Sequence, residues 1–350
     1  MFSSSLRAIL FGLALGAASS VFALPSVSLK LTGPDDVEHV ADLKVTATVT
    51  NTGDETLKLL KDPLSPLSTL PANTFHIEGT TGAVPAFVGI KAKYVPTTAA
   101  KSQDPSVFTV LAPGQSVDVQ HDLSKAYNFA SSGTGAYSFE AHDTFYYVKD
   151  NGDVATLQAD SEAQFTTVSG TLTVPQPQIR KRVNYNSCSQ SQQSDIATAL
   201  PGVVKYAKGA YSYLQAHKKS TTRYKSWFGA YSKSNHDLVA SHYKKIGSSN
   251  FNSFTFDCSC TDAGTYAYVS PDQYGQIYFC GAFWNANTTG TDSKAGTIIH
   301  ESSHFIVNGG TDDYVYGQTK CRALAKSDPS SAVMNADSHE YFAENNPSES

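Results

Sequence analysis

The stretch GTIIHESSHF at residues 296–305 contains the pattern His-Glu-x-x-His, with His300 and His304 four positions apart. On an α-helix these two positions lie on one face, about one turn apart, so both imidazoles can reach one Zn²⁺ ion. Glu301 then lies beside the metal and can take a proton from a metal-bound water molecule. The alternative is an ordinary surface helix. The two isoleucines that precede the pattern favour a buried helix and therefore a metal site.

A zinc site of this kind needs a third protein ligand, whose identity separates the families that share the pattern. A metzincin would have Gly at position 307 and His at position 310, but this chain has Val307 and Gly310, which excludes that family. The glycines at 309 and 310 permit the positive φ that a reversal of the chain requires. An aspartate in the returning segment 311–317 can then complete a His/His/Asp site, whereas a gluzincin-like site would use the downstream Glu340.

The returning segment reads GTDDYVYG at residues 310–317. Together with His-Glu-x-x-His, it resembles the signature G-T-x-D-x-x-Y-G of the deuterolysin-type aspzincins, which are zinc metallopeptidases. The resemblance implies that Asp313, rather than Asp312, is the third zinc ligand, with one zinc ion per catalytic domain. It also implies that Tyr316 stabilises the oxyanion of the transition state, beside Glu301 as the general base.

A closer similarity connects residues 184–350 with the fungal peptidyl-Lys metalloendopeptidases. The stretches that carry it are FDCSC, YFCGAFW, TGTDSKAGT, HESSHF, NGGT and VMNADSHEYFAENNP. The similarity implies a secreted endopeptidase that hydrolyses peptide bonds on the N-terminal side of lysine, so that lysine is the P1′ residue. A broad-specificity, deuterolysin-like protease is the alternative within the same group of enzymes.

Two acidic residues offer a physical basis for a preference for lysine. Asp337 and Glu340 are three positions apart, so on a helix they share a face. In the subgroup that the sequence resembles, such a pair lines the S1′ pocket and binds the lysine ammonium. A charge-assisted contact contributes about 1.5–3 kcal/mol, enough to discriminate against neutral side chains by about one to two orders of magnitude. Without the resemblance, a solvated helix face is the more common reading of such a pair.

The five cysteines are unevenly placed, because all of them follow residue 187. In an oxidising compartment this predicts a disulfide-stabilised C-terminal domain and a disulfide-free N-terminal one. Cys258 and Cys260 are too close to bridge each other comfortably, and a metal–thiolate site is the less favoured alternative. An odd number leaves at least one thiol free or paired between chains. The resemblance implies the pairs Cys188–Cys258 and Cys260–Cys280 and has no counterpart for Cys321.

The N-terminus predicts secretion. Arg7 precedes a short apolar run at residues 8–18, and Val21-Phe22-Ala23 ends in small residues suited to signal-peptide cleavage after Ala23. The apolar run is well short of the roughly 20 residues that a membrane span needs. Farther along, Arg180-Lys181-Arg182 follows two prolines and offers a basic processing site, although basic triplets are also common in linkers. We therefore expect a signal peptide (1–23), a propeptide (24–182) and a metalloendopeptidase domain (183–350).

The two long regions differ in their hydrophobic period. Alternating residues predict strands in the first region, and the expected strands are 27–31, 43–49, 75–77, 116–123 and 136–148. The second region predicts helices at 191–219, 236–246, 295–305, around 322 and at 332–344, with short strands at 254–260, 265–270 and 276–280. The expected fold class is α+β: a mainly helical, zincin-like catalytic domain with a small antiparallel sheet, preceded by an all-β, sandwich-like propeptide.

The composition of the chain restricts the classes of molecule that it can bind. The chain of 350 residues has a net charge of −5 and no long basic block, which argues against nucleic acid as the principal partner. We expect a secreted monomer that acts on protein and peptide substrates containing lysine, without a membrane partner, and that contacts its own propeptide. The propeptide would assist folding or block the cleft. Two other readings stay open, namely a zinc hydrolase of non-peptide amides and a non-enzymatic binding module with an incidental His-Glu-x-x-His.

Overall fold

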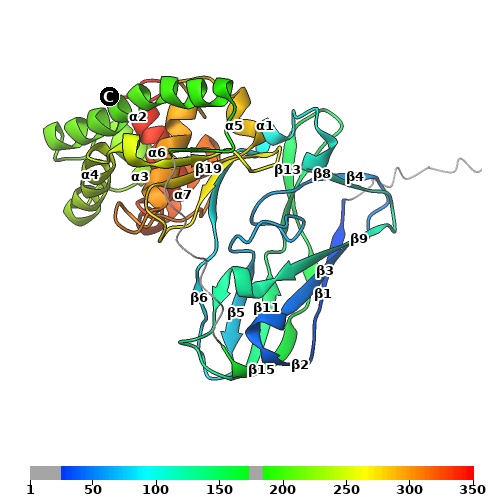
Figure 1. The fold of residues 1–350 in the computed structure, drawn as a ribbon. Helices are drawn as coiled ribbons and strands as arrows, with labels where there is room; N and C mark the ends of the chain where they lie inside the picture. The colour runs from blue at the N-terminus through cyan, green and yellow to red at the C-terminus, as the bar shows by residue number, and fades with distance from the viewer. Residues whose placement is uncertain (1–24, 173–183) are drawn as a thin grey trace, which may run out of the picture.

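The computed structural model describes residues 25–172 and 184–350, which combine helices with β-sheets in a mixed α/β architecture (Figure 1). The expected signal peptide and the expected processing site at Arg182 lie outside the described residues. Within the described ranges, no helix is both long and apolar enough to cross a bilayer.

The N-terminal region, residues 25–172, consists mainly of short strands. Its strands are β1 (Val27–Thr32), β2 (Asp36–His39), β3 (Lys44–Asn51), β4 (Leu57–Leu60), β5 (Phe75–Gly79), β6 (Ala86–Phe87), β7 (Lys91–Tyr94), β8 (Phe108–Leu111), β9 (Ser116–Asp122), β10 (Tyr127–Asn128), β11 (Gly135–Ala141), β12 (Thr144–Val148), β13 (Val154–Gln158), β14 (Asp160–Ser161) and β15 (Gln164–Thr171). The helix α1 (Pro96–Ala99) and the 3₁₀ turns η1 (Val40–Asp42), η2 (Pro105–Val107) and η3 (Leu123–Lys125) connect them.

Apart from β7, these strands form three four-stranded sheets and a two-stranded one. The orders are β14-β1-β3-β9, β2-β15-β11-β5, β13-β12-β4-β8 and β10-β6. The alternation of apolar and polar residues in the sequence favours these strands, because it gives each strand one face to bury. In β3 the side chains of Val45, Ala47 and Val49 are buried, while their neighbours along the strand are partly exposed. One buried cluster draws on both the β1–β3 and the β5–β11–β15 strands. The run expected as one strand at 136–148 is two strands, because the chain changes from one sheet to another between β11 and β12.

The C-terminal region, residues 184–350, holds the long helices. These are α2 (Gln190–Ala216), α3 (Thr222–Phe228), α4 (Lys233–Gly247), α5 (Gly281–Asn285), α6 (Lys294–His304), α7 (Gln318–Ser327), α8 (Pro329–Ala332) and α9 (Ala336–Glu344), with η4 (Phe251–Ser253). Ser189 caps α2, where it accepts a hydrogen bond from the backbone of Gln192. Pro201 lies inside α2 and does not end it. Helix α6 packs against α9 and α2, which places it at the centre of this region.

The expectation of a small antiparallel sheet in this region is wrong. The sheet has the order β16-β17-β19-β18-β7 and is mixed, with parallel pairing of β16 (Tyr185–Asn186) with β17 (Thr255–Asp257) and of β17 with β19 (Gln276–Phe279). Helices α2–α4 separate β16 from β17, and parallel strands need such a long crossover. Only β18 (Thr265–Val269) pairs antiparallel, with β19 on one side and β7 of the N-terminal region on the other.

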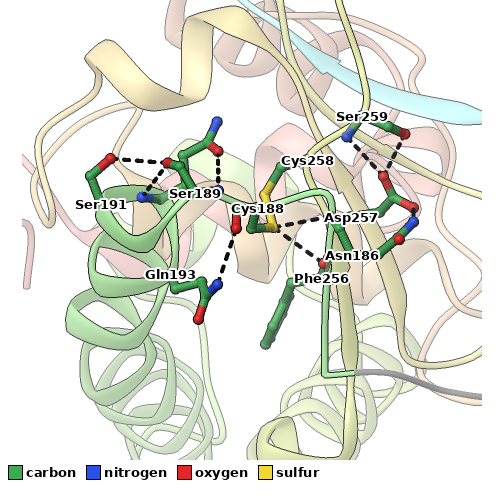
Figure 2. The surroundings of a disulfide bond; sticks show 10 residues. Asn186, Cys188, Ser189, Ser191, Gln193, Phe256, Asp257, Cys258 and Ser259 are labelled. Atoms are coloured by element: carbon green, nitrogen blue, oxygen red, sulfur yellow. Dashed lines mark hydrogen bonds between the residues drawn. A yellow bond between two sulfur atoms is a disulfide. The ribbon is translucent and has the colours of Figure 1, made fainter.

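Two disulfides lie in the C-terminal region. Cys188–Cys258 joins the start of α2 to the end of β17 (Figure 2), and Cys260–Cys280 joins the following loop to the end of β19. They are the pairs that the resemblance implied. Cys321 is buried in α7 as a free thiol, and the Asn335 side-chain amide donates a hydrogen bond to its sulfur.

Candidate active site

Helix α6 presents the two histidines of the His-Glu-x-x-His pattern on one buried face. Ser293 begins the helix by accepting a hydrogen bond from the backbone of Gly296, and every residue of α6 is buried. The Nε2 atoms of His300 and His304 lie 3.1 Å apart. The spacing of four residues thus brings two imidazole nitrogens to one point, as the helical period predicts.

The chain turns back after α6 and brings Asp313 to the same point. The carbonyl oxygen of Phe305 accepts hydrogen bonds from three successive amides, and Gly310 has a φ of 61°, which favours glycine. Asp313 Oδ1 then lies 3.1 Å from His300 Nε2 and 3.4 Å from His304 Nε2. Burial alone would raise the pKa of Asp313, but the two histidines outweigh it and hold this pKa well below its usual value.

These three atoms fit a tetrahedral zinc ion. With Zn–N and Zn–O distances of about 2.0–2.1 Å, the ligand atoms of a tetrahedral site are about 3.3–3.4 Å apart. The separations of 3.1, 3.1 and 3.4 Å between the three ligand atoms come close to these values. Two imidazoles and a carboxylate are also a donor set that zinc accepts. The residues present therefore fit the metal that the pattern predicts.

A second layer of contacts orients both imidazoles. His304 Nδ1 lies 2.8 Å from the carbonyl oxygen of Thr311, and His300 Nδ1 lies 2.9 Å from Asp337 Oδ1. An imidazole that donates from Nδ1 keeps a lone pair on Nε2, which is the atom that faces the shared point. Asp337, one of the two carboxylates of the predicted substrate pocket, thus also contacts a predicted metal ligand.

Glu301 and Tyr316 lie on either side of one peptide bond of the N-terminal region. Glu301 Oε1 accepts a hydrogen bond of 3.0 Å from the backbone of Lys93, and the Tyr316 hydroxyl donates one of 3.0 Å to the carbonyl oxygen of Ala92. Burial raises the pKa of Glu301 to about 8. Burial also raises the pKa of Tyr316 well above its usual value, so its hydroxyl stays protonated as a donor.

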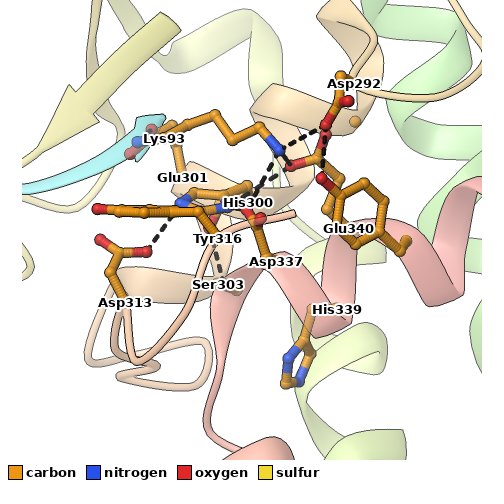
Figure 3. Close-up of polar contacts among 12 residues, drawn as sticks. Lys93, Asp292, His300, Glu301, Ser303, Asp313, Tyr316, Asp337, His339 and Glu340 are labelled. Carbon is orange, nitrogen blue, oxygen red and sulfur yellow. Dashed lines mark hydrogen bonds and ion pairs between the residues drawn. The ribbon is translucent and has the colours of Figure 1, made fainter. Parts of the chain in front are cut away.

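The predicted lysine pocket holds a lysine of the chain itself. Lys93 Nζ lies 2.8 Å from Glu340, 3.2 Å from Asp337 and 3.1 Å from Asp292, and the Lys93 side chain is fully buried (Figure 3). Burial alone would lower the pKa of Lys93, but Asp337 and Glu340 outweigh it and hold this pKa well above its usual value. Lys93 is therefore a buried ammonium paired with three carboxylates.

The structure brings the predicted site residues together around α6. These residues are His300, Glu301, His304, Asp313, Tyr316, Asp337 and Glu340. Sequence reasoning missed Lys93 and Asp292. Asp292 lies in TGTDSKAGT, a stretch that marked the family but carried no assigned role. Nothing in the local sequence distinguishes Lys93 from the other lysines of the N-terminal region.

Comparisons with known proteins give a consistent result. Residues 213–344 match the family model described as lysine-specific metallo-endopeptidase. The chain is 52% identical over 353 residues to a protein named peptidyl-Lys metalloendopeptidase from Grifola frondosa, and 48% identical over 353 residues to one of the same name from Armillaria mellea, with full coverage of both partners in each case. A solved structure titled zinc peptidase from Grifola frondosa is 56% identical and covers 47% of this chain and 100% of that chain, with a TM-score of 0.46.

Proposed function

The chain belongs to the family of peptidyl-Lys metalloendopeptidases, and from this premise we propose that residues 183–350 form a zinc endopeptidase domain that hydrolyses peptide bonds on the N-terminal side of lysine. The observation that carries the proposal is the buried ammonium of Lys93, which Asp337 and Glu340 hold beside the His-Glu-x-x-His helix. A pocket that neutralises one lysine side chain in this way suits the lysine side chain of a substrate.

One zinc ion would be held by His300, His304 and Asp313. A bound zinc ion would act as a Lewis acid and lower the pKa of a water molecule. The alternative third ligand, Glu340, faces the other nitrogen of His300: its Oε2 lies 3.5 Å from Nδ1, whereas Asp313 lies near the Nε2 atoms of both histidines. This arrangement favours Asp313 as the ligand and leaves Glu340 to the pocket.

Two side chains would carry the proton and charge movements. Glu301 acts as the general base: it removes a proton from the attacking water and later passes it to the leaving amine. Its contact with the backbone nitrogen of Lys93 supports this role, because that nitrogen corresponds to the leaving group of a peptide substrate. Tyr316 donates to the oxygen that becomes negatively charged, as its hydrogen bond to the carbonyl of Ala92 suggests.

The proposal extends to the whole precursor. Residues 1–23 act as a signal peptide for secretion, and residues 24–182 form a sandwich-like propeptide. Cleavage after Arg182 creates the N-terminus of the mature domain, residues 183–350, which is mainly helical and zincin-like and acts as a monomer once the propeptide has dissociated. The buried cluster shared by the β1–β3 and β5–β11–β15 strands supports the sandwich, since two sheets that share one core pack face to face.

The proposed specificity is tested by changing Glu340 to Gln in the processed domain. The change keeps the side-chain shape but removes one of the carboxylates around the ammonium, so the preference for lysine over neutral P1′ residues falls by about 10- to 100-fold. Mass spectrometry of a digested protein mixture, with and without a chelator, measures P1′ preference and metal dependence together. The matched control is Asp237→Asn, a half-exposed carboxylate of α4 paired with Lys233.

Unchanged lysine selectivity in Glu340→Gln would contradict the pocket. Relaxed selectivity of the wild-type domain would favour the broad-specificity alternative instead. Cleavage that persists in the chelator would contradict the dependence on zinc. No cleavage at all, together with the absence of zinc from the purified protein, would contradict the endopeptidase and favour a binding module.

A further inference from the structure

Strand β7 belongs to the N-terminal region by sequence but to the C-terminal sheet by pairing. It runs antiparallel to the edge strand β18, with Ala92 opposite Tyr268 and Lys93 opposite Ala267. In Figure 3 the ribbon of this strand enters the site beside α6, and Lys93 extends from it toward the carboxylates. An exposed sheet edge offers unpaired backbone groups, and adding a strand to such an edge is a common way to bind an extended peptide.

The backbone contacts of β7 converge on the Ala92–Lys93 peptide bond. The Ala92 amide donates to Asp313 Oδ2 at 3.0 Å, its carbonyl oxygen accepts from Tyr316 at 3.0 Å, and the Lys93 amide donates to Glu301 at 3.0 Å. The group proposed to stabilise the oxyanion therefore lies on the carbonyl of this bond. The proposed base lies on its nitrogen.

The side chains on the two sides of Lys93 are also enclosed. Lys93 itself is fully buried, and Ala92 and Tyr94 are 1% and 0% exposed. Lys91, two residues earlier, donates to the carbonyl of Thr311 and pairs with the half-exposed Asp312, both at 2.7 Å. A second peptide cannot enter the lysine pocket while Lys93 fills it.

We propose that β7 occupies the active-site cleft in the manner of a substrate, with Lys93 as its P1′ residue, and that Ala92–Lys93 is a bond which the chain hydrolyses in itself. This inference rests on the proposed function. Until the bond is cut, the same strand closes the cleft to other substrates, so the N-terminal region acts as an inhibitor that is also a substrate.

The proposed reaction is the hydrolysis of the Ala92–Lys93 peptide bond, which consumes one water molecule. Water adds across the bond, with its oxygen forming a new bond to the Ala92 carbonyl carbon while the carbon–nitrogen bond to Lys93 breaks. One water proton goes through Glu301 to the Lys93 nitrogen. The products are a new carboxylate at Ala92 and a new amino terminus at Lys93, and no other reactant is needed.

The test uses the full chain purified in the presence of a chelator and then supplied with zinc. Terminal peptides are identified by mass spectrometry over time at several protein concentrations. We expect fragments that end at Ala92 and begin at Lys93, formed with a first-order rate constant that does not change with precursor concentration. Lys93→Met, which is neutral and of similar length, slows this cut at least 100-fold, and Glu301→Gln abolishes it. The control Lys30→Met, which makes the same change at an exposed lysine of β1, keeps it.

A second measurement tests whether β7 occupies the cleft, and it requires neither metal nor catalytic activity. Hydrogen exchange of the amides at residues 91–94 is followed in the metal-free precursor. These amides are protected in the wild type, in Glu301→Gln and in Lys93→Arg, which keeps the charge, but exchange at least 10-fold faster in Lys93→Met. Equal protection in Lys93→Met and the wild type would overturn the role of Lys93 in holding the strand.

The failure of this inference differs from a failure of the proposed function. If the processed domain cuts an added lysine peptide but the zinc-loaded precursor never forms the Ala92 and Lys93 ends, the self-cleavage is wrong and the function stands. A cut at Ile90–Lys91 would overturn the stated register. An apparent first-order rate constant that rises with precursor concentration would overturn the intramolecular course. If neither the peptide nor the precursor is cut, the function itself fails.

Discussion

Asp62 shows how the environment of a single residue sets its charge. It follows β4, its Oδ1 accepts a hydrogen bond of 3.0 Å from the backbone of Leu64, and its side chain is buried. Burial raises the pKa of Asp62 to about 6, although the Leu64 amide and Lys320 of α7 act in the opposite direction. The folded chain therefore keeps the Asp62 proton to a higher pH than the unfolded chain does.

The raised pKa of Asp62 predicts that a neutral side chain at this position stabilises the precursor at neutral pH. A carboxyl group whose folded pKa is raised contributes stability that is complete below its unfolded pKa, near 4, and that is lost as the pH rises through the folded pKa, near 6. At pH 7 the ionised Asp62 therefore costs the precursor roughly 3 kcal/mol. Asp62→Asn keeps an acceptor for Leu64 and removes this cost. We expect a higher melting temperature at pH 7 and a gain that vanishes near pH 4.

Thermal unfolding of the precursor between pH 4 and pH 8 measures this effect. Asp150→Asn, in an exposed turn, is the control and leaves the unfolding curve unchanged. A gain from Asp62→Asn that is the same at every pH would show that burial of the charge is not its cause.

At the scale of elements, the contact between α6 and α9 places the two α9 carboxylates that pair with Lys93. Gly296 of α6 faces two carboxylates of α9: a Cβ at this position would lie 2.0 Å from Glu344 Oε1 and 2.9 Å from Glu340 Oε1. Glu344 in turn accepts hydrogen bonds from the amide and hydroxyl of Ser293, the residue that caps α6. The absence of a side chain at Gly296 leaves the space that lets the α9 carboxylates lie close to α6.

We therefore expect Gly296→Ala to damage the pocket. The added methyl group displaces Glu340 and Glu344 and lowers the stability by about 1–3 kcal/mol. This loss exceeds the gain of about 1 kcal/mol that alanine has over glycine in a helix. Thermal unfolding and P1′ profiling of the processed domain measure both consequences, and the preference for lysine falls along with the melting temperature.

Gly209→Ala is the matched control on a different helix. Gly209 is exposed on α2 and a Cβ there would meet nothing within 4 Å, so only the helix propensity changes and stability rises by up to about 1 kcal/mol. Equal effects of the two substitutions would show that close contact with α9 is not what Gly296 provides.

At the scale of the whole molecule, β7 makes one sheet out of two regions. Its contacts with α6, β18 and the α9 carboxylates are all made between residues of the described ranges, 25–172 and 184–350. A cut after Arg182 therefore leaves these contacts in place. Separation of the regions then requires loss of the β7 contacts as well.

This arrangement predicts that cleavage of the linker alone does not release the N-terminal region. Glu301→Gln precursor, which cannot cut itself, is cleaved after Arg182 by a protease specific for basic sites and passed over a size-exclusion column. We expect the two fragments to elute together at micromolar concentration, and to separate when Lys93→Met is added to the same precursor. Separate elution of the Glu301→Gln fragments would contradict a stable association through β7.

The sequence by itself determined the features that depend on neighbours along the chain. The i, i+4 spacing of His300 and His304 predicted the helix and their shared face, and alternation predicted strands such as β1 and β3. The resemblance extended this to Asp313 and Tyr316, which lie in a motif only a few residues further on. These are short-range properties, since helical and strand periods act within a few positions.

Only the tertiary structure decided which distant segments meet. The mixed sheet, the approach of Asp292 and the entry of Lys93 all depend on packing between regions, and Lys93 contacts Glu301 and Asp337 across 208 and 244 positions of sequence. The residues around Lys93 resemble those around other strand lysines, so the local sequence cannot predict that this side chain is buried. Its burial depends on a complementary pocket made by distant segments. The physical reason is that three carboxylates from two distant segments, α9 and the loop before α6, make the burial of one ammonium favourable only where they converge.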